Sequence, residues 1–188
     1  YTAKGIFYSI QAALKFYLQK DIKDSVISLQ GAGSVGSQLA KLLGDMGARI
    51  YVQDIDQVKL QQLSTEKIYI VDNALTQECD LLSPCAVGGI FTESSIQNLG
   101  CKIIAGGANN QLLNSSIDSH LYKKGIHYIP DVLINSGGVI GLTKDILKRS
   151  DLQIEEDLKL IGKRALDSMS FAQGNNISVL DAIDNLLI

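Results

Sequence analysis

Three closely spaced glycines between an apolar segment and a helical pattern constrain the fold of this chain more than any other feature. The sequence at residues 31–36 is GAGSVG. The preceding residues 25–30 (SVISLQ) predict a short buried strand, and the apolar residues of segment 35–46 recur at the spacing of one helix face. The glycines therefore lie at a predicted strand-to-helix turn, which is the local context of a dinucleotide-binding α/β fold.

Each residue of this turn has a predicted role. Gly31 allows the tight bend, Gly33 lets the backbone approach a diphosphate without a Cβ in the way, and Gly36 lets the helix pack closely on the strand. Ser34 and Val35 begin the helix, whose first N–H groups are unpaired and carry about half a positive charge. We predict that this turn binds the phosphates of a dinucleotide. The alternative is an ordinary turn, since glycines also cluster without any ligand.

An acidic residue follows the second predicted strand. Residues 49–53 (RIYVQ) form an apolar run that ends at Asp54, about 20 residues after the last glycine, where dinucleotide-binding folds place an acid for the adenine ribose. A carboxylate accepts hydrogen bonds from ribose hydroxyls and repels a 2′-phosphate, so Asp54 favours NAD over NADP. We include its neighbour Ile55 in the predicted cofactor site. Asp56 could be confused with this acid, but we interpret it as the N-cap of a helix beginning near Gln57.

Length and charge exclude several classes of protein. At 188 residues the chain allows one domain with a substantial core, and it is too short for a nucleotide domain joined to a full catalytic domain. Its 17 basic and 20 acidic residues give a net charge of −3 without a run of Lys or Arg, which argues against binding to nucleic acid or an anionic membrane. No apolar run has the length of a membrane span and no signal pattern opens the chain, so we expect a soluble, cytoplasmic protein.

The three cysteines, Cys79, Cys85 and Cys101, follow neither a metal-ligand spacing nor an even disulfide framework. We expect reduced thiols that are mostly buried, and no metal site. The chain opens with Tyr1 rather than methionine, so we expect a processed product or a piece of a longer protein.

Predicted strands and helices alternate along most of the chain. The strands are apolar runs rather than alternating ones, which is expected where helices cover both faces of a sheet. The pattern predicts an α/β fold with a doubly wound parallel sheet of the Rossmann type. The remaining strands are expected at 67–71, 80–82, 102–105 and 127–129, and the remaining helices at 1–19, 57–63, 94–99, 115–124, 137–149, 152–171 and 178–187.

We expect a single dinucleotide-binding domain over residues 1–188. Within it, residues 1–20 form an amphipathic helix that we interpret as a bridge to a preceding segment, 21–150 form the Rossmann core, and 151–188 form a helical extension. A domain that binds the substrate and carries the catalytic residues is expected to lie N-terminal to this chain and outside it.

Three loops at the carboxyl ends of later strands hold small residues and amides. They are SPCAVGG at 83–89, AGGANNQ at 105–111 and PDVLINSGGVI at 130–140. Small residues let the backbone approach a cofactor, and an Asn side chain can both donate to and accept from a ribose or a nicotinamide amide. Asn109 and Asn110 also suit a plain turn. Asn135 also suits the N-cap of a close-packed helix that begins at Gly137 and Gly138.

These motifs and two others resemble the NAD-binding domain of the leucine, phenylalanine and valine dehydrogenases in the glutamate dehydrogenase superfamily. The resemblance covers nearly the whole chain in the family's order and includes TAKGI at residues 2–6 and ISVLDAID at 177–184. It implies that the parent enzyme interconverts an L-amino acid with its 2-oxo acid and ammonia, passes a hydride to NAD, and is a homo-oligomer.

The resemblance also implies roles for single residues. The turn from Gly31 to Gly36 would hold the pyrophosphate and Asp54 the adenine ribose. The residues expected at the nicotinamide end are Cys85, Ala86, Ala108 and Asn109 beside the ribose, Asn135 between cofactor and substrate, and Thr2 near the nicotinamide. Related enzymes often carry Asp where this chain has Asn109, which changes the polarity of that contact.

A catalytic lysine is missing from the positions that the resemblance indicates. Oxidative deamination needs a general base of lowered pKa, and the resembled family supplies it from a Gly-Gly-x-Lys sequence that this chain lacks. His120 and His127 are predicted to be structural, and Lys144 to lie on a solvated helix face. We therefore expect the chain to bind NAD without turnover and assign it no catalytic residue. Two alternatives to a leucine, valine or phenylalanine dehydrogenase are a glutamate dehydrogenase and a non-catalytic, NAD-sensing regulatory domain.

Overall fold

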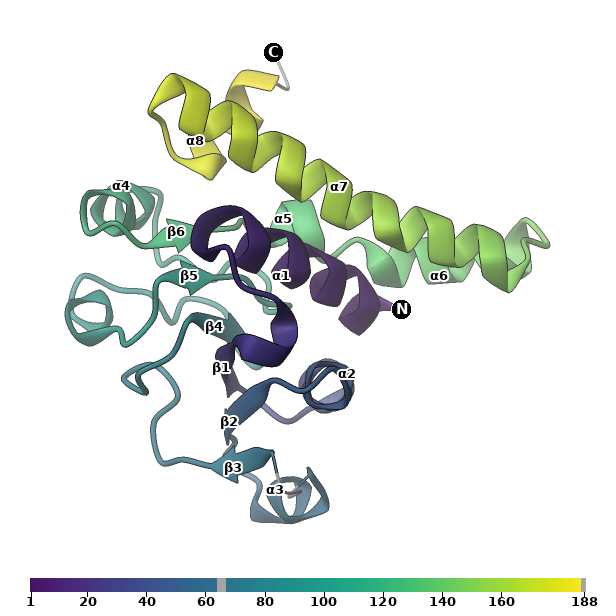
Figure 1. The fold of residues 1–188 in the computed structure, drawn as a ribbon, viewed down its shortest axis with the longest axis horizontal. Coiled ribbons are helices and arrows are strands. Elements are labelled where there is room, and N and C mark those ends of the chain that lie inside the picture. Colours follow the sequence, from purple (N-terminus) through teal and green to yellow (C-terminus); the bar gives the residue numbers. More distant parts are fainter. Residues whose placement is uncertain (64–66, 187–188) are drawn as a thin grey trace.

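The computed structural model describes residues 1–63 and 67–186, and a six-stranded parallel sheet lies at its centre (Figure 1). The strands are β1 (Val26–Gln30), β2 (Arg49–Gln53), β3 (Ile68–Ile70), β4 (Leu81–Pro84), β5 (Ile103–Ile104) and β6 (His127–Tyr128). Their order is β3-β2-β1-β4-β5-β6, and every neighbouring pair is parallel. The chain moves outward from β1 to β3 and then continues with β4 on the other side of β1. This reversal is the switch point of a doubly wound sheet, so the predicted fold class is confirmed.

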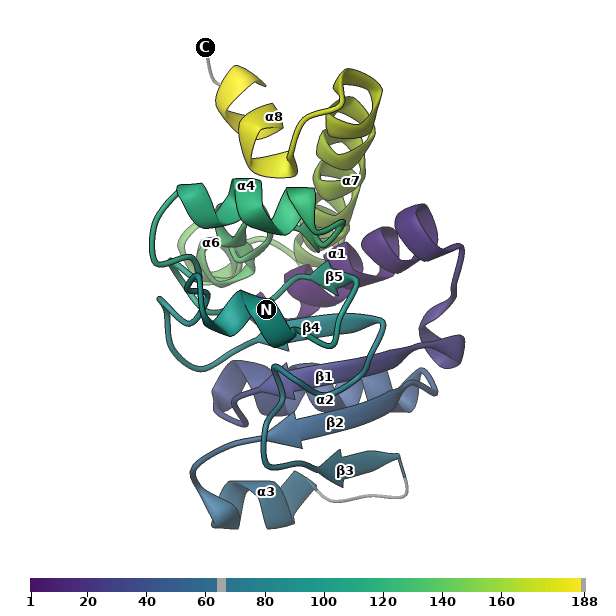
Figure 2. The same ribbon diagram turned by 90° about the vertical axis from the view of Figure 1, so that its left-hand side faces the viewer.

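Helices cover the sheet, and the C-terminal ones extend beyond it (Figures 1 and 2). They are α1 (Thr2–Leu18), α2 (Ser34–Asp45), α3 (Gln57–Leu63), α4 (Ser116–Lys123), α5 (Asp131–Ile134), α6 (Gly137–Ile146), α7 (Asp151–Asn175) and α8 (Val179–Leu186), with the short 3₁₀ helices η1 (Ile22–Asp24) and η2 (Ser95–Asn98). Most predicted helices agree with these bounds to within a few residues. Residue 187, at the end of the last predicted helix, lies outside the described residues.

The helical segment predicted at 94–99 is present, but it is the short 3₁₀ helix η2 rather than an α-helix. The Thr92 N–H donates to Oγ of Ser95 at 2.9 Å, and the Ser95 N–H donates to Oγ1 of Thr92 at 3.1 Å. These hydroxyl groups offer the backbone an alternative to helical bonds, which is why the segment does not continue as an α-helix.

Two further element boundaries differ from the prediction. Strand β4 continues to Pro84, beyond the expected end at residue 82, and residues 131–134, expected as part of a loop, form the short helix α5. Pro130 is the N-cap of that helix, where the absence of an N–H has no cost. Both differences lie at the carboxyl edge of the sheet, where the candidate site is found.

Apolar residues on the two faces of the sheet form two buried clusters. In β4, Leu81 belongs to the larger cluster with residues of α1, α2 and α7, whereas the next residue, Leu82, belongs to the smaller cluster on the opposite face. Ile103 and Ile104 of β5 divide in the same way. Because successive strand residues point to opposite faces, this division explains why the strands are unbroken apolar runs.

Helix α1 is a component of the larger cluster. Ile6, Ile10 and Leu14 are fully buried, and the helix packs against α7, α2 and α6 (Figure 1). Burial of each such side chain contributes roughly 1.5–3 kcal/mol to folding. An added Cβ at Gly162 of α7 would lie 2.8 Å from the carbonyl oxygen of Tyr8, so glycine lets the two helices cross at close range. The predicted bridge from residues 1–20 to a preceding segment stays a prediction.

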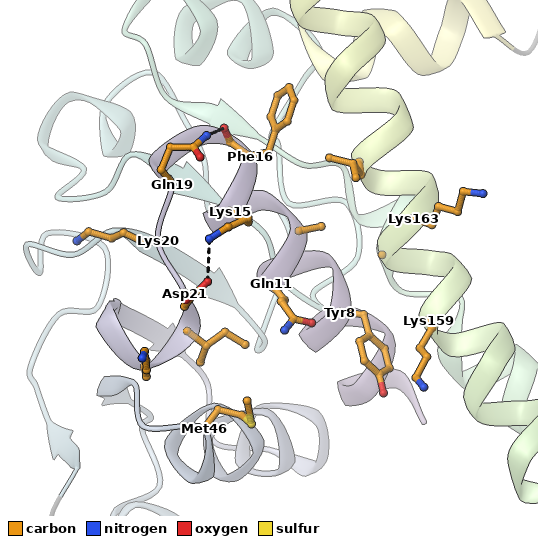
Figure 3. A pocket seen from close by; sticks show the side chains of 15 residues that line it. Tyr8, Gln11, Lys15, Phe16, Gln19, Lys20, Asp21, Met46, Lys159 and Lys163 are labelled. Atoms are coloured by element: carbon orange, nitrogen blue, oxygen red, sulfur yellow. Dashed lines mark hydrogen bonds and ion pairs between the residues drawn. The ribbon is translucent and has the colours of Figure 1, made fainter.

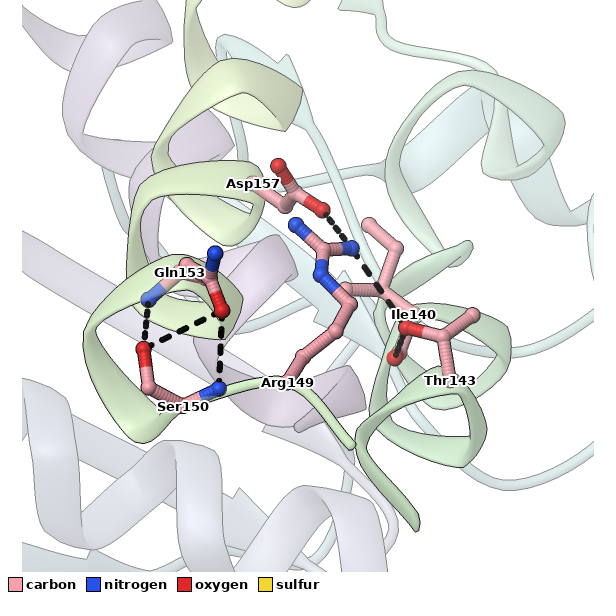
Figure 4. Close-up of polar contacts among 6 residues, drawn as sticks. All are labelled: Ile140, Thr143, Arg149, Ser150, Gln153 and Asp157. Atoms are coloured by element: carbon pink, nitrogen blue, oxygen red, sulfur yellow. Dashed lines mark hydrogen bonds and ion pairs between the residues drawn. The ribbon is translucent and has the colours of Figure 1, made fainter. Parts of the chain in front are cut away.

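Polar contacts hold the turn between α6 and α7 (Figure 4). Arg149 Nη1 donates to Oδ2 of Asp157 at 2.5 Å and to Oγ1 of Thr143 at 3.5 Å. Ser150 caps α7, because its Oγ accepts from the Gln153 N–H while Oε1 of Gln153 accepts from the Ser150 N–H. This capping box and the ion pair fix the start of α7 and its position relative to α6.

Among the described residues, no helix combines the length and the apolar composition of a membrane span. Within residues 1–63 and 67–186, no three or more His, Cys, Asp or Glu side chains are grouped so that they could hold a metal ion. Cys79 and Cys101 are buried free thiols and Cys85 is a half-buried one. Burial raises the pKa of all three, that of Cys101 to about 12, so none is a thiolate at neutral pH.

Candidate functional site

The glycine turn joins β1 to α2, and its three glycines meet different constraints. Gly31 has a φ of +106°, and an added Cβ there would lie 2.7 Å from Cβ of Ala86. An added Cβ at Gly36 would lie 2.0 Å from the Gly31 carbonyl oxygen. At Gly33, φ is −69° and an added Cβ would meet nothing within 4 Å in the described chain. The packing of the protein therefore requires glycine at positions 31 and 36 but not at 33.

The start of α2 offers unpaired donors. Gly33 is the N-cap and has no side chain that could accept from them, and the first backbone bond runs from Ser37 N to Gly33 O at 2.9 Å. Within the described residues, no acceptor is bonded to the N–H groups of Ser34, Val35 and Gly36. These groups and the positive end of the helix favour an anion at this place.

A pocket of about 230 Å³ lies beside this helix start. Its lining includes Gly33 and Ser34 from the turn and the lysines Lys41 of α2 and Lys59 of α3. Lys41 adds positive charge to this pocket, whereas Lys59 is paired with Asp56 at 3.3 Å. Neither was among the predicted site residues, although Lys41 follows Ser34 by about two helical turns and so lies on the same helix face.

Asp54 follows β2 and is bonded to the glycine turn. One carboxylate oxygen accepts from the Ala32 N–H at 2.5 Å and the other from the Asp56 N–H at 2.9 Å. Burial acts to raise the pKa of Asp54, but these two donors and the charge of Lys59 outweigh it, so the pKa lies below its ordinary value. The carboxylate is therefore ionised at neutral pH, and each oxygen keeps a further lone pair for a sugar hydroxyl.

The two residues after Asp54 have separate outcomes. Asp56 Oδ1 accepts from the N–H groups of Val58 and Lys59 at 3.0 and 3.3 Å, so its predicted role as the N-cap of α3 is confirmed. Ile55 has a side chain that is 97% exposed. Its assignment to the cofactor site stays a prediction.

The loop after β4 lies directly against the glycine turn. The Cys85 N–H donates to the Gln30 carbonyl oxygen at 2.7 Å, which continues the pairing of β1 with β4 to the edge of the sheet. Ala86 packs at Gly31, and Cβ of Cys85 lies 3.2 Å from the position of an added Cβ at Gly36. The small side chains of Cys85 and Ala86 thus form a wall beside the turn.

The loop after β5 is shaped by a buried amide. Gln111 is fully buried, and its Nε2 donates to the carbonyl oxygens of Gly106 and Ala108, both at 2.9 Å. The Ala108 N–H donates in turn to the Pro84 carbonyl oxygen at 2.9 Å, which joins this loop to the one after β4. Gln111 cannot be told apart in the sequence from the exposed amides beside it, because its burial depends on how the loop packs.

Two predicted site residues from different loops are bonded to each other. Asn135 Nδ2 donates to Oδ1 of Asn109 at 2.6 Å. The other atoms of the pair, Nδ2 of Asn109 and Oδ1 of Asn135, have no bonded partner in the described chain, which leaves one donor and one acceptor for a ligand. The alternative role of Asn135 as an N-cap is wrong, because Asn135 is the C-cap of α5 and Ser136 is the N-cap of α6.

Asp131 connects the second and third loops. Its buried carboxylate accepts from the Asn110 N–H at 3.1 Å and from the Tyr128 hydroxyl at 3.3 Å. Burial and the neighbouring Asp131 raise the pKa of Tyr128 well above its usual range, so this hydroxyl stays a donor. Asn110, rather than Asn109, has the left-handed backbone of a turn residue, with φ at 51°.

Thr2 lies beside the start of α6. An added Cβ at Gly138 would be 2.8 Å from Oγ1 of Thr2, and one at Gly137 would be 2.7 Å from the Tyr1 carbonyl oxygen. The prediction of a close-packed helix start at these glycines is confirmed. Thr2 therefore neighbours the segment that carries Asn135.

Together these contacts form a band along the carboxyl edge of the sheet. It passes from Asp54 to Ala32, from Gly31 to Ala86, from Gly88 to the Asn109 backbone, from Asn109 to Asn135, and from Gly138 to Thr2. An ionised carboxylate lies at one end, an uncapped helix start lies next to it, and free amide groups lie at the other end. The band fits a dinucleotide, whose sugars and diphosphate need these groups in this order.

The residues predicted to be structural make contacts of their own. The ring of His127 stacks on Tyr17 with centroids 3.7 Å apart, and burial lowers the pKa of His127. Lys144 Nζ pairs with Oδ1 of Asp151 at 2.5 Å on the surface of α6. His120 is half-buried on α4.

Comparison with known proteins identifies relatives of this chain. The family model of the glutamate/leucine/phenylalanine/valine dehydrogenases matches residues 51–170. The phenylalanine dehydrogenase of Thermoactinomyces intermedius is 34% identical over 193 residues, which cover 100% of this chain and 53% of the relative. The leucine dehydrogenase of the same organism is 33% identical over 98% of this chain and 52% of its own length. The chain thus spans about half the length of the curated relatives it matches.

Solved structures agree with this relationship. The L-tryptophan dehydrogenase of Nostoc punctiforme superposes with a TM-score of 0.92 at 30% identity, covering 98% of this chain and 58% of that one. A hetero-hexameric glutamate dehydrogenase from Thermus thermophilus superposes with a TM-score of 0.76 over 96% of this chain and 49% of that one, but at 18% identity this likeness concerns the fold alone. This chain belongs to the glutamate/leucine/phenylalanine/valine dehydrogenase family.

Proposed function

We propose that this chain is the NAD-binding part of an L-amino-acid dehydrogenase. The parent enzyme would convert an L-amino acid reversibly to its 2-oxo acid and ammonia, with hydride transfer to NAD. The observation that carries the proposal is the combination at the glycine turn: open space at Gly33, unpaired N–H groups at the start of α2, and an ionised Asp54 bonded to the turn. The named activities of the phenylalanine, leucine and tryptophan dehydrogenases support the class of reaction.

The roles of residues at the adenine end follow from their chemistry. The N–H groups of Ser34, Val35 and Gly36 would donate to the diphosphate, and Asp54 would accept from the adenine ribose. A 2′-phosphate would meet the negative charge of Asp54, so NAD is preferred over NADP.

At the nicotinamide end, the chain supplies a wall and two amides. Cys85, Ala86 and Ala108 keep side-chain volume low beside the ribose, and the free groups of Asn109 and Asn135 would bond the ribose or the nicotinamide amide. Bound NAD supplies the hydride acceptor. The Asn109–Asn135 pair and the nearby Thr2 would hold the ring in one orientation and thereby present one face of it to the substrate.

The chemistry at the substrate needs groups from outside this chain. We propose that the general-base lysine, the partner of the substrate carboxylate and the homo-oligomer contacts belong to the part of the enzyme that this chain does not include. The chain alone would then bind NAD without turnover. An apolar amino acid such as leucine, valine or phenylalanine is the proposed substrate type.

Isothermal titration of the 188-residue chain with NAD and with NADP tests the binding step. We expect NAD to bind in the high micromolar range or more weakly, and NADP to bind more weakly still. Tighter binding of NADP would contradict the role of Asp54, and no binding of either would contradict the site. An activity panel with leucine, valine, phenylalanine, tryptophan and glutamate, run on the protein at the length of its relatives, tests the reaction and the substrate.

A further inference from the structure

A groove on the face of the molecule formed by α1, α2 and α7 is independent of the proposed cofactor site. It encloses about 1010 Å³ (Figure 3). Figure 3 shows α1 along its floor and α7 along one side, with Met46 at the end of α2 on the opposite side. The volume is of the size that proteins use to bind a ligand or a segment of another chain.

The groove is built from two helical stripes. Helix α1 and its C-cap contribute Tyr8, Gln11, Ala12, Lys15, Phe16 and Gln19. Helix α7 contributes Lys159, Gly162, Lys163 and Leu166. Both sets recur at intervals of three and four residues, so each is one face of its helix. The stripe on α1 is about 17 Å long, which matches about three turns of a further helix lying alongside it.

Positive charge collects in this groove against the balance of the whole chain. Five of its lining residues are lysines and one is an aspartate, whereas the chain as a whole has a net charge of −3. Lys15 pairs with Asp21 at 3.1 Å and Lys20 with Asp80 at 2.8 Å. The remaining three, Lys23, Lys159 and Lys163, have no ion pair within the described residues.

Apolar side chains accompany these charges. Met46 is 50% exposed and Leu166 is 38% exposed, and α1 adds the half-buried Ala12 and Phe16. A small inorganic anion would use the lysines but leave this apolar surface in water. An occupant with one apolar face and acidic edges would satisfy both.

The groove is preformed by contacts between α1 and α7. Gly162 lets α7 cross α1 at Tyr8, and the Tyr8 hydroxyl donates to Glu155 of α7. Lys4 of α1 pairs with the same carboxylate at 2.5 Å. Burial and the bond to Glu155 raise the pKa of Tyr8 to about 12, so the hydroxyl remains a donor at neutral pH. A groove whose walls are already fixed binds a partner without a further cost of ordering them.

We propose that this lysine groove docks an acidic amphipathic helix of a partner protein. The helix would place its apolar side chains over Ala12, Phe16, Met46 and Leu166, and its carboxylates beside Lys23, Lys159 and Lys163. The charge of the groove, the two helical stripes and the exposed apolar side chains each match a different property of such a helix.

The test uses a fluorescein-labelled synthetic peptide of about 18 residues, a length that allows appreciable helix in water. Leucines recur in it every three or four residues and glutamates flank them. A second peptide has the same composition with the leucines distributed around the helix. Fluorescence anisotropy measures the binding of each to the 188-residue chain. We expect the patterned peptide to bind at least about tenfold more tightly, and its affinity to fall as salt shortens the range of charge interactions.

Variants locate the binding. The double substitution Lys159→Glu and Lys163→Glu is expected to weaken binding at least about tenfold, and Met46→Ser with Leu166→Ser several-fold. The matched control reverses two exposed lysines outside the groove, Lys102→Glu and Lys123→Glu, and is expected to change affinity less than about twofold. Circular dichroism checks that each variant is folded.

Several outcomes would overturn the proposal. If the two peptides bound with equal affinity, or if the control variant lost as much affinity as the Lys159 and Lys163 variant, only net charge would matter for binding. If tripolyphosphate displaced the peptide completely, and if the Met46 and Leu166 substitutions did not change the peptide's affinity, the groove would be a simple anion site. A dimer of the chain by light scattering that dissociates on reversing Lys159 and Lys163 would show that a second copy occupies the groove. None of these results depends on NAD binding.

Discussion

The two ends of the band at the carboxyl edge of the sheet are made in different ways. At the end formed by β1 and β2, the groups available to a ligand are backbone N–H groups of α2 and one carboxylate held by backbone donors. At the end formed by β4, β5 and β6, they are side-chain amides positioned by the buried Gln111 and Asp131. The first end therefore depends on where the backbone can go, and the second on which side chains are present.

The largest effect is expected where the backbone of the first end has no free space. Gly36→Ala would place a Cβ 2.0 Å from the Gly31 carbonyl oxygen, so helix and strand must separate. We expect the free energy of unfolding to fall by about 3 kcal/mol or more, with loss of NAD binding. Urea denaturation measures the first quantity and calorimetric titration the second.

The same helix offers a matched control. An added Cβ at Gly44 of α2 would lie 3.9 Å from the nearest atom, Cδ1 of Ile68, which is an ordinary contact. Gly44→Ala is expected to raise the free energy of unfolding by up to about 1 kcal/mol, because alanine is the better helix former. A destabilised Gly44→Ala, or a stable Gly36→Ala, would contradict the packing described for this turn.

A second substitution separates binding from folding. In Gly33→Ala, the added methyl group meets no atom of the described chain, and the backbone at this position needs no positive φ. The free energy of unfolding should therefore fall by no more than about 1 kcal/mol, which is the difference between glycine and alanine at an N-cap. The added methyl group would lie where the backbone must approach a diphosphate. We expect NAD affinity to fall more than about tenfold by calorimetric titration. Unchanged affinity would place the phosphates elsewhere.

The difference between the two ends also decides what could be predicted from the sequence. The glycine turn and the N-cap Asp56 were predictable because each depends on residues close together in the chain, and Asp54 because its spacing from the last glycine is shared by dinucleotide-binding folds. The bond between Asn109 and Asn135 was not, since it depends on how two loops pack. Asn135 is the C-cap of α5, a helix that the sequence pattern does not predict, and for this reason its alternative role as an N-cap is wrong.

The lysine groove shows the same limit. Each of its stripes has helical spacing that can be read in the sequence, but their adjacency follows from the crossing of α1 and α7 at Tyr8 and Gly162. The two lysines beside the glycine turn, Lys41 and Lys59, come together for a similar reason, because α2 and α3 are placed side by side only by the sheet. Contacts within one element were predictable, whereas contacts between elements needed the fold.

An intermediate effect is expected at the amide end. Asn135→Ala removes the bond to Asn109 and one acceptor for the nicotinamide half of the cofactor. We expect NAD affinity to fall about fivefold, which corresponds to the free energy of about one hydrogen bond. The affinity for ADP-ribose, which lacks the nicotinamide, should stay unchanged. Titrations with both ligands measure the difference.

The control for this variant is Asn114→Ala, at an exposed turn before α4, where among the described residues the side-chain amide accepts only from Ser116. It is expected to leave both affinities unchanged. If Asn135→Ala weakened ADP-ribose as much as NAD, the two ends of the band would not be independent, and the contrast between them would not hold.

The smallest effect is expected at the contact of Lys4 and Tyr8 of α1 with Glu155 of α7, none of which is predicted to bind the cofactor, so this contact serves as a comparison for both ends. Glu155 accepts from Lys4 and from Tyr8, and these bonds hold its pKa below the ordinary value of 4.5. A carboxylate whose pKa is lowered by folding contributes its full stabilisation above the pKa of the unfolded chain, here 4.5. This contribution disappears as the pH falls through the lower pKa of the folded state. Acid should therefore weaken the contact only below pH 4.5.

Glu155→Gln removes the charge while keeping an acceptor. We expect the free energy of unfolding at neutral pH to fall by about 1 kcal/mol or less, because Lys4 is partly exposed and water screens the pair. The loss of stability between pH 5 and pH 3, values that bracket the ordinary pKa of 4.5, should be smaller than in the parent chain. The control Glu156→Gln, an exposed neighbour without an ion pair in the described residues, should leave stability at neutral pH unchanged. Because Glu155 lies outside the band, NAD affinity should not change in either variant, and a change would mean that the packing of α1 on α7 positions the cofactor site.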